Sequence, residues 1–137
     1  MREADNTNVV KQAYAAFGRG DVHGVLDALD PEVRWRPVTG ASPAVPMQGE
    51  RREKAAVAEF FSILARSMTF EVFEPREFVA QGNKVVALGY YKARTAAGRP
   101  FASEWVMVFT LVNGKVAEFQ EFTDAAALNA AFEAVPA

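Results

Sequence analysis

The sequence predicts an α+β fold: a cone-shaped, curved antiparallel sheet with three to four helices packed on its concave face. Two observations predict this class. Apolar residues recur every three or four positions in residues 8–19, 21–30 and 51–67 and again after residue 124, which is the period of helices. Between residues 69 and 124 they alternate instead, and three glycine-containing turns divide this part into four strands.

Two helices are expected near the N-terminus. Residues 8–19 place apolar side chains at helical spacing, with a polar cap before them and a glycine after them. Residues 21–30 form a short second helix, which Asp21 caps and Pro31 ends.

A short strand and a third helix are expected next. Residues 33–38 alternate and include Pro37, so we expect a strand at the edge of the sheet. Residues 39–50 are rich in proline and glycine and are expected to form a loop. Residues 51–67 return to helical spacing and predict the third helix.

The alternating part predicts four strands that pair in sequence order through tight turns. These strands are residues 69–80, 84–94, 101–112 and 115–124. Both faces of residues 84–94 carry apolar side chains, so the pattern leaves open which face lines the interior. A final helix begins at Asp124 and carries Leu128, Ala131, Phe132 and Val135.

Composition limits the possible functions. The 137 residues, half of them apolar, predict a single domain over 1–137 with an ordered core from about 6 to 135. With no cysteine, one histidine and no glycine-rich phosphate loop, we expect no metal and no cofactor. The net charge of −2 argues against nucleic-acid binding, and no apolar run is long enough for a membrane span. The polar N-terminal residues lack a signal core, so we expect a cytoplasmic location.

Four stretches carry a family resemblance: AYAAFGRGD, REKAAVAEFF, EFVAQGNKVVALG and VFTLVNGKVAEFQEFTDAAAL. In this order, and over almost the whole chain, they resemble the SnoaL-like branch of the nuclear transport factor 2-like superfamily. That family includes isomerases, polyketide cyclases, dehydratases and epoxide hydrolases, along with many members that only bind or associate. The resemblance implies a pocket between sheet and helices, and usually a dimer through the outer sheet face. It does not imply a reaction.

The catalytic set of the related steroid isomerases is absent. Aligning VRWRPV with that branch puts Arg36 where the branch carries its proton-abstracting aspartate. Met107 falls at the position of its hydrogen-bonding acid. Ala13 falls at or next to the position of its tyrosine, with Tyr14 one residue away. A ketosteroid isomerase of that design is therefore not expected.

The hairpin around Asn113-Gly114 decides which carboxylate points inward. A two-residue type I′ turn places Trp105 opposite Phe122, whereas a three-residue turn with a bulge glycine places Trp105 opposite Glu121. The two arrangements exclude each other, because a slip of one residue moves every side chain to the other face. The second gathers apolar residues around a single acid, Glu121, and we prefer it.

Three residues are candidates for catalysis. Glu121 beside Trp105 would lose hydration, which raises the pKa of a carboxyl toward neutrality and suits it to acid–base work; a wetted or Arg-paired rim acid is the alternative. Asp124 lies near an acid used by related cyclases, but it is also well placed to cap the last helix. Arg36 can clamp a carboxylate or enolate oxygen; the alternative is a solvated side chain on the strand face opposite Trp35.

Two functional classes stay open. The first is a cofactor-independent isomerase, cyclase, dehydratase or hydrolase that acts on a small hydrophobic molecule by carboxylate acid–base chemistry. The second is a non-catalytic ligand-binding or dimerisation module. An open cavity that holds a carboxylate favours the first, and a cavity filled by side chains favours the second. The expected ligand-binding residues are Tyr14, Phe17, Trp35, Phe60, Trp105, Met107 and Phe119.

The other face of the last two strands is apolar enough to predict a homodimer. A monomer rarely exposes a large apolar sheet surface, so a second copy is expected to cover it. The apolar residues and threonine assigned to this face are Val106, Val108, Thr110, Val116 and Phe122.

Overall fold

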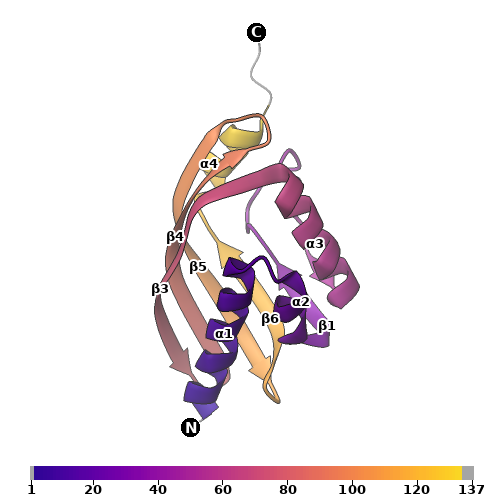
Figure 1. Cartoon of the computed structure of the whole chain (residues 1–137), viewed down its shortest axis with the longest axis vertical. Helices are drawn as coiled ribbons and strands as arrows, with labels where there is room; N and C mark the ends of the chain where they lie inside the picture. The colour runs from indigo at the N-terminus through magenta and orange to yellow at the C-terminus, as the bar shows by residue number, and fades with distance from the viewer. Residues whose placement is uncertain (1, 134–137) are drawn as a thin grey trace.

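A six-stranded sheet curls around the helices α1, α2 and α3, and α4 lies at one end of the molecule (Figure 1). The strand order is β2-β1-β6-β5-β4-β3. Neighbouring strands are antiparallel except β1 and β6, which run parallel. The α+β class is confirmed, but the sheet is mixed. Hairpin turns reveal only the pairing of consecutive strands, whereas β1 and β6 are far apart in the sequence.

The computed structural model describes residues 2–133. The expected end of the ordered core at residue 135, and Val135 in the last helix, lie outside these residues. The helices are α1 (Arg2–Gly18), α2 (Val22–Asp27), α3 (Lys54–Ser67) and α4 (Ala125–Phe132). The strands are β1 (Leu29–Arg36), β2 (Arg51–Arg52), β3 (Met68–Gln81), β4 (Lys84–Thr95), β5 (Pro100–Val112) and β6 (Lys115–Phe122).

The first half of the chain departs from the sequence prediction in three places. Helix α1 begins at Arg2 rather than at residue 8. Strand β1 begins at Leu29, because α2 ends four residues before Pro31. Residues Arg51–Arg52, expected in the third helix, form β2 and pair with Trp35 and Arg34 of β1. Strand β1 is therefore not the edge strand, since the two residues of β2 lie outside it.

The β5–β6 hairpin closes through a two-residue turn, so the expected three-residue turn is wrong. Asn113 and Gly114 have φ values of 50° and 77°, which is the left-handed pair that a type I′ turn requires. Val112 accordingly pairs with Lys115. One residue further on, Ala117 forms a β-bulge, since Leu111 pairs with Val116 and Thr110 pairs with Glu118.

The bulge at Ala117 restores the face that the sequence predicted for Glu121. Beyond it, Met107 lies opposite Glu121 and Phe109 lies opposite Phe119, so these four side chains share the concave face. Before it, Val116 also points inward and is fully buried. The assignment of Val116 to the outer face is therefore wrong, because the alternation of β6 changes phase at the bulge.

Strand β4 presents its odd-numbered residues to the concave face. Val85, Ala87, Gly89, Tyr91 and Ala93 are buried there, so most of this wall is built from small side chains with one tyrosine among them. Gly89 is required by the neighbouring strand, because a Cβ atom at this position would lie 2.3 Å from the indole of Trp105. This settles the face that the sequence left open.

Candidate functional site

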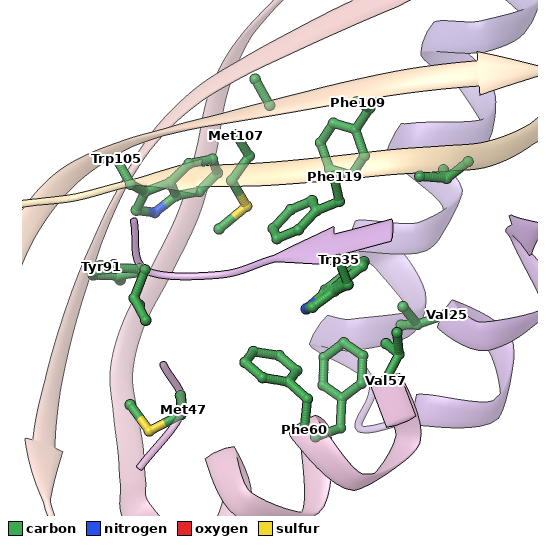
Figure 2. Close-up of a cluster of buried hydrophobic side chains, with 14 of the residues drawn as sticks. Val25, Trp35, Met47, Val57, Phe60, Tyr91, Trp105, Met107, Phe109 and Phe119 are labelled. Atoms are coloured by element: carbon green, nitrogen blue, oxygen red, sulfur yellow. The ribbon is translucent and has the colours of Figure 1, made fainter. Parts of the chain in front are cut away.

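An apolar cavity of about 90 Å³ lies between the helices and the concave face of the sheet. Figure 2 shows part of its wall, with aromatic and methionine side chains turned toward a common space. Side chains from all four helices and from strands β1, β3, β4, β5 and β6 contribute. The lining residues are Ala13, Tyr14, Phe17, Val25, Trp35, Val38, Met47, Phe60, Phe61, Leu64, Met68, Phe70, Phe73, Tyr91, Phe101, Met107, Phe109, Phe119, Glu121 and Leu128.

Glu121 is the one carboxyl group among the described residues that line this cavity. Its side chain accepts a hydrogen bond of 2.9 Å from the Tyr91 hydroxyl and one of 3.3 Å from the backbone N–H of Val38. The Tyr91 oxygen also lies 2.7 Å from the Thr123 hydroxyl. Because Tyr91 has a single hydroxyl proton, it donates to Glu121 while Thr123 donates to it. The carboxyl group is therefore held in one orientation.

The cavity favours neutral forms of its titratable groups. Burial raises the pKa of the Glu121 carboxyl, and the hydrogen bonds from Tyr91 and Val38 oppose this shift only in part. Burial, reinforced by the nearby charge of Glu121, also raises the pKa of Tyr14 and of Tyr91. Glu121 is thus able to hold a proton at a higher pH than an exposed glutamate, which is the property that proton transfer near neutrality needs.

The loop after β1 supports Glu121 through two backbone amides. Val38 donates to the side chain and Thr39 donates to the carbonyl oxygen of Glu121, at 3.0 Å. Val38 has φ of 40°, in the left-handed region that β-branched residues avoid. A strained backbone persists only where the surroundings hold it, and strain of this kind is concentrated at functional sites.

Stacked rings continue the wall beside Glu121. The ring centroids of Trp35 and Phe119 lie 3.8 Å apart at an angle of 17°, and Phe60 and Phe61 pack against the indole at tilted angles. Phe17 reaches the cavity from α1 and packs against Phe73. Tyr14 directs its hydroxyl to the Met107 sulfur, 3.0 Å away.

Residues 10–119 match the model of the SnoaL-like domain family. The chain belongs to this family. A nuclear transport factor 2-like protein of Burkholderia xenovorans is 31% identical, with a TM-score of 0.85 over 96% of this chain and 98% of that one. A second one, from Burkholderia pseudomallei, is 30% identical, with a TM-score of 0.86 over 95% and 98%. TerC, co-crystallised with polyporic acid, is 25% identical, with a TM-score of 0.81 over 95% and 99%. No curated protein matches the chain significantly.

This SnoaL-like structure brings seven of the predicted site residues to the cavity wall. They are Tyr14, Phe17, Trp35, Phe60, Met107, Phe119 and Glu121. Trp105, also predicted to contact a ligand, is buried but does not line the cavity. Its indole lies over Gly89 and stacks with Tyr14 and Phe73, so it supports the wall from behind.

The two other predicted catalytic residues lie away from the cavity. Arg36 contacts Glu118 at 3.4 Å on the outer face of the sheet, with a third of its side chain exposed. The sequence also allowed this position, a side chain on the strand face opposite Trp35, as the alternative to a ligand clamp. Asp124 accepts a hydrogen bond of 3.0 Å from the N–H of Ala127 and caps α4. Its side chain is exposed, so helix capping accounts for it.

Two important wall residues escaped the sequence analysis. Tyr91 is a hydrogen-bond partner of Glu121. The small residues that alternate with it in β4 were the signal in the sequence that this face of the strand points inward. Val38 was expected at the end of the strand 33–38, on the face opposite Trp35, but β1 ends at Arg36 and Val38 lies in the loop that follows, where alternation does not apply. Within residues 2–133, no helix has the length and apolar character needed to cross a membrane. The same residues contain no cluster of three or more His, Asp or Glu side chains suited to a metal ion.

Proposed function

We propose that the cavity binds a small, largely apolar organic molecule and that Glu121 exchanges a proton with it. The chain would then be a cofactor-independent isomerase, lyase or hydrolase of the SnoaL-like type. The observation that carries this proposal is the position of Glu121: a single buried carboxyl in an apolar cavity, oriented by Tyr91 and Val38. Such a carboxyl combines a raised pKa with a fixed direction.

The methionines of the wall support binding of an organic ligand. Met47, Met68 and Met107 all line the cavity, and their unbranched thioether side chains rearrange easily around guests of different shape. At about 90 Å³ the cavity is smaller than the roughly 150 Å³ that admits benzene in an engineered protein core. Methionine movement would supply the missing space. TerC offers a precedent, since it was co-crystallised with an organic acid.

The small cavity also supports a second candidate, a binding module without chemistry. In that case the side chains fill most of the interior and Glu121 only fastens the loop that follows β1. The two candidates differ in whether Glu121 moves a proton to or from a bound molecule.

Exchange of the α-protons of cyclohexanone in D₂O distinguishes the two candidates. We expect the protein to accelerate exchange above the buffer rate, and Glu121→Gln to remove this acceleration. Glu118→Gln is the matched control, because Glu118 lies on the same strand but faces outward. Equal rates for the wild type and Glu121→Gln would reject the catalytic role and favour the binding module.

We also infer a homodimer through the outer sheet face. Val86, Leu88, Val106 and Val108 are partly exposed on neighbouring strands, and Phe122 is 42% exposed beside them. A second copy would remove this apolar surface from water. Sedimentation at micromolar concentration should give about twice the 15.0 kDa of one chain, and Val108→Lys should return it to one chain. A wild type that sediments as one chain would contradict the dimer.

A further inference from the structure

The indole nitrogen of Trp35 is a buried donor without a partner. Trp35 is only 5% exposed, and its Nε1 atom has no hydrogen-bond acceptor among the described residues. Burying a donor in this way costs free energy, so most buried N–H groups find a partner in the protein, in ordered water or in a ligand. An unpaired N–H group in the wall of a cavity therefore indicates that a ligand of this cavity carries a hydrogen-bond acceptor.

The position of Trp35 directs this donor into the cavity. Phe119 stacks on its indole, and Phe60 and Phe61 pack against it at tilted angles, so the ring has little freedom to turn. Figure 2 shows the indole nitrogen turned toward the space bounded by Met47 and Met107. The N–H group is thus held in a fixed direction beside the cavity, covered by neighbouring side chains that a ligand would have to move aside.

The other polar groups of the wall are already engaged. The Glu121 carboxyl accepts from Tyr91 and Val38, and the Tyr14 hydroxyl contacts the Met107 sulfur. A buried water needs two to four polar partners, which an apolar wall of this composition does not offer beside Trp35. A hydrogen-bond acceptor on an otherwise apolar ligand would pair with the indole N–H, and such a ligand needs no further polar partners in the wall.

We propose that Trp35 Nε1 donates a hydrogen bond to a carbonyl or ether oxygen of the ligand. The cavity would then select apolar molecules that carry such an oxygen over pure hydrocarbons of the same shape. Trp35 would fix the orientation of the ligand relative to Glu121, which lines the same cavity. This inference rests on the proposed function, because it assumes that the cavity takes a ligand.

The chain contains its own control for this proposal. Trp105 is also buried with an unpartnered Nε1 atom, but it does not line the cavity. These two are the only tryptophans, so a ¹⁵N-labelled sample gives two indole N–H signals. Trp35→Phe and Trp105→Phe assign them.

The test uses two probes of matched shape, cyclohexanone and methylcyclohexane. Titration with cyclohexanone should move the Trp35 N–H proton signal downfield, as a new hydrogen bond requires, and methylcyclohexane should not. The Trp105 signal should respond weakly to both. Trp35→Phe should lower the preference for cyclohexanone over methylcyclohexane about five- to tenfold, the usual effect of one hydrogen bond, because the smaller ring changes the apolar contacts of both probes alike.

Two results would overturn the proposal, and they differ in what else they reject. If both probes bind and move the Trp35 signal alike, the donor role is wrong but the ligand site stands. If neither probe changes any signal from the cavity wall, both the donor role and the ligand site fall. The wild-type titration decides without a variant, so poor folding of Trp35→Phe would not obscure the answer.

Discussion

Glu118 and Glu121 lie three residues apart on β6, yet they occupy opposite faces of the sheet. Glu118 is on the outer face, where its side chain is 43% exposed and contacts Arg36. Glu121 is on the concave face, where it is 6% exposed and accepts from Tyr91 and Val38. An exposed ion pair contributes little to stability, whereas a buried carboxyl has its protonation controlled by the protein. Two glutamates on one strand therefore differ in role, because Glu118 faces outward and Glu121 faces the cavity.

Shifting the register beyond the bulge should break this comparison and give the largest effect. Inserting one alanine between Glu118 and Phe119 moves the rest of β6 by one residue and turns Phe119 and Glu121 outward. We expect a loss of more than about 5 kcal/mol in the free energy of unfolding, comparable to the whole stability of a small domain, and urea unfolding measures this loss. Deleting Ala117 is the control, because Val116 already pairs with Leu111 and Glu118 with Thr110, so the deletion keeps both faces of β6 and should cost far less. An insertion variant as stable as the wild type would show that β6 takes up the added residue in a second bulge.

Truncation of a ring on the concave side should give the next largest effect. Phe17 is half-buried and packs against Phe61, Phe70 and Phe73, so Phe17→Ala should cost about 3 kcal/mol. The control is Val112→Ala, since Val112 is 47% exposed and should cost less than about 0.5 kcal/mol. The urea midpoints of the two variants measure the difference between their free energies of unfolding. Equal midpoints would mean that α1 is not packed on the sheet as described.

The two glutamates should differ in how their removal changes stability with pH. Burial raises the folded-state pKa of Glu121, so the native protein holds this proton at a pH where the unfolded chain has lost it. Stability should therefore fall as pH rises above the unfolded value of about 4.3, and this fall should end once pH passes the folded pKa. Glu121→Gln removes the penalty and should be more stable than the wild type at pH 8.

This pH effect is measured by urea unfolding between pH 4 and pH 8. The advantage of Glu121→Gln should shrink toward pH 4, where wild-type Glu121 is mostly protonated in both states. Glu118→Gln serves as the outward-facing control and should change stability by less than about 0.5 kcal/mol. An NMR titration of the Glu121 carboxyl carbon gives the pKa directly. A midpoint at or below about 4.3 would contradict the raised pKa.

The smallest effect is expected for the partner of Glu118. Arg36→Gln removes an ion pair of 3.4 Å between partly exposed side chains, which should cost no more than about 1 kcal/mol. It should also leave cyclohexanone exchange unchanged, because Arg36 does not line the cavity. A large loss of exchange would bring Arg36 back into the site that the sequence first suggested.

The sequence predicts most of the strands, because alternation and glycine turns are local signals. It also predicts the inward face of Glu121, although for the wrong reason: a type I′ turn followed by a bulge at Ala117 gives the same face as the expected three-residue turn. The pairing of β1 with β6 and the orientation of Val38 could not be predicted. Both depend on contacts between segments far apart in the chain, which no periodicity reveals.

The loop from residue 37 to residue 50 has a consequence for the rate of ligand exchange. It supplies Val38 and Met47, the described wall residues that belong to no helix or strand. Its first end is attached to Glu121, and at its far end the Arg51 guanidinium donates to the carbonyl oxygens of Met47, Gln48 and Gly49. Opening this loop breaks these hydrogen bonds and exposes the buried Val45 and Met47, but it leaves the sheet ladders intact. The residence time of a bound molecule would thus depend on these attachments, while its affinity would depend on the wall.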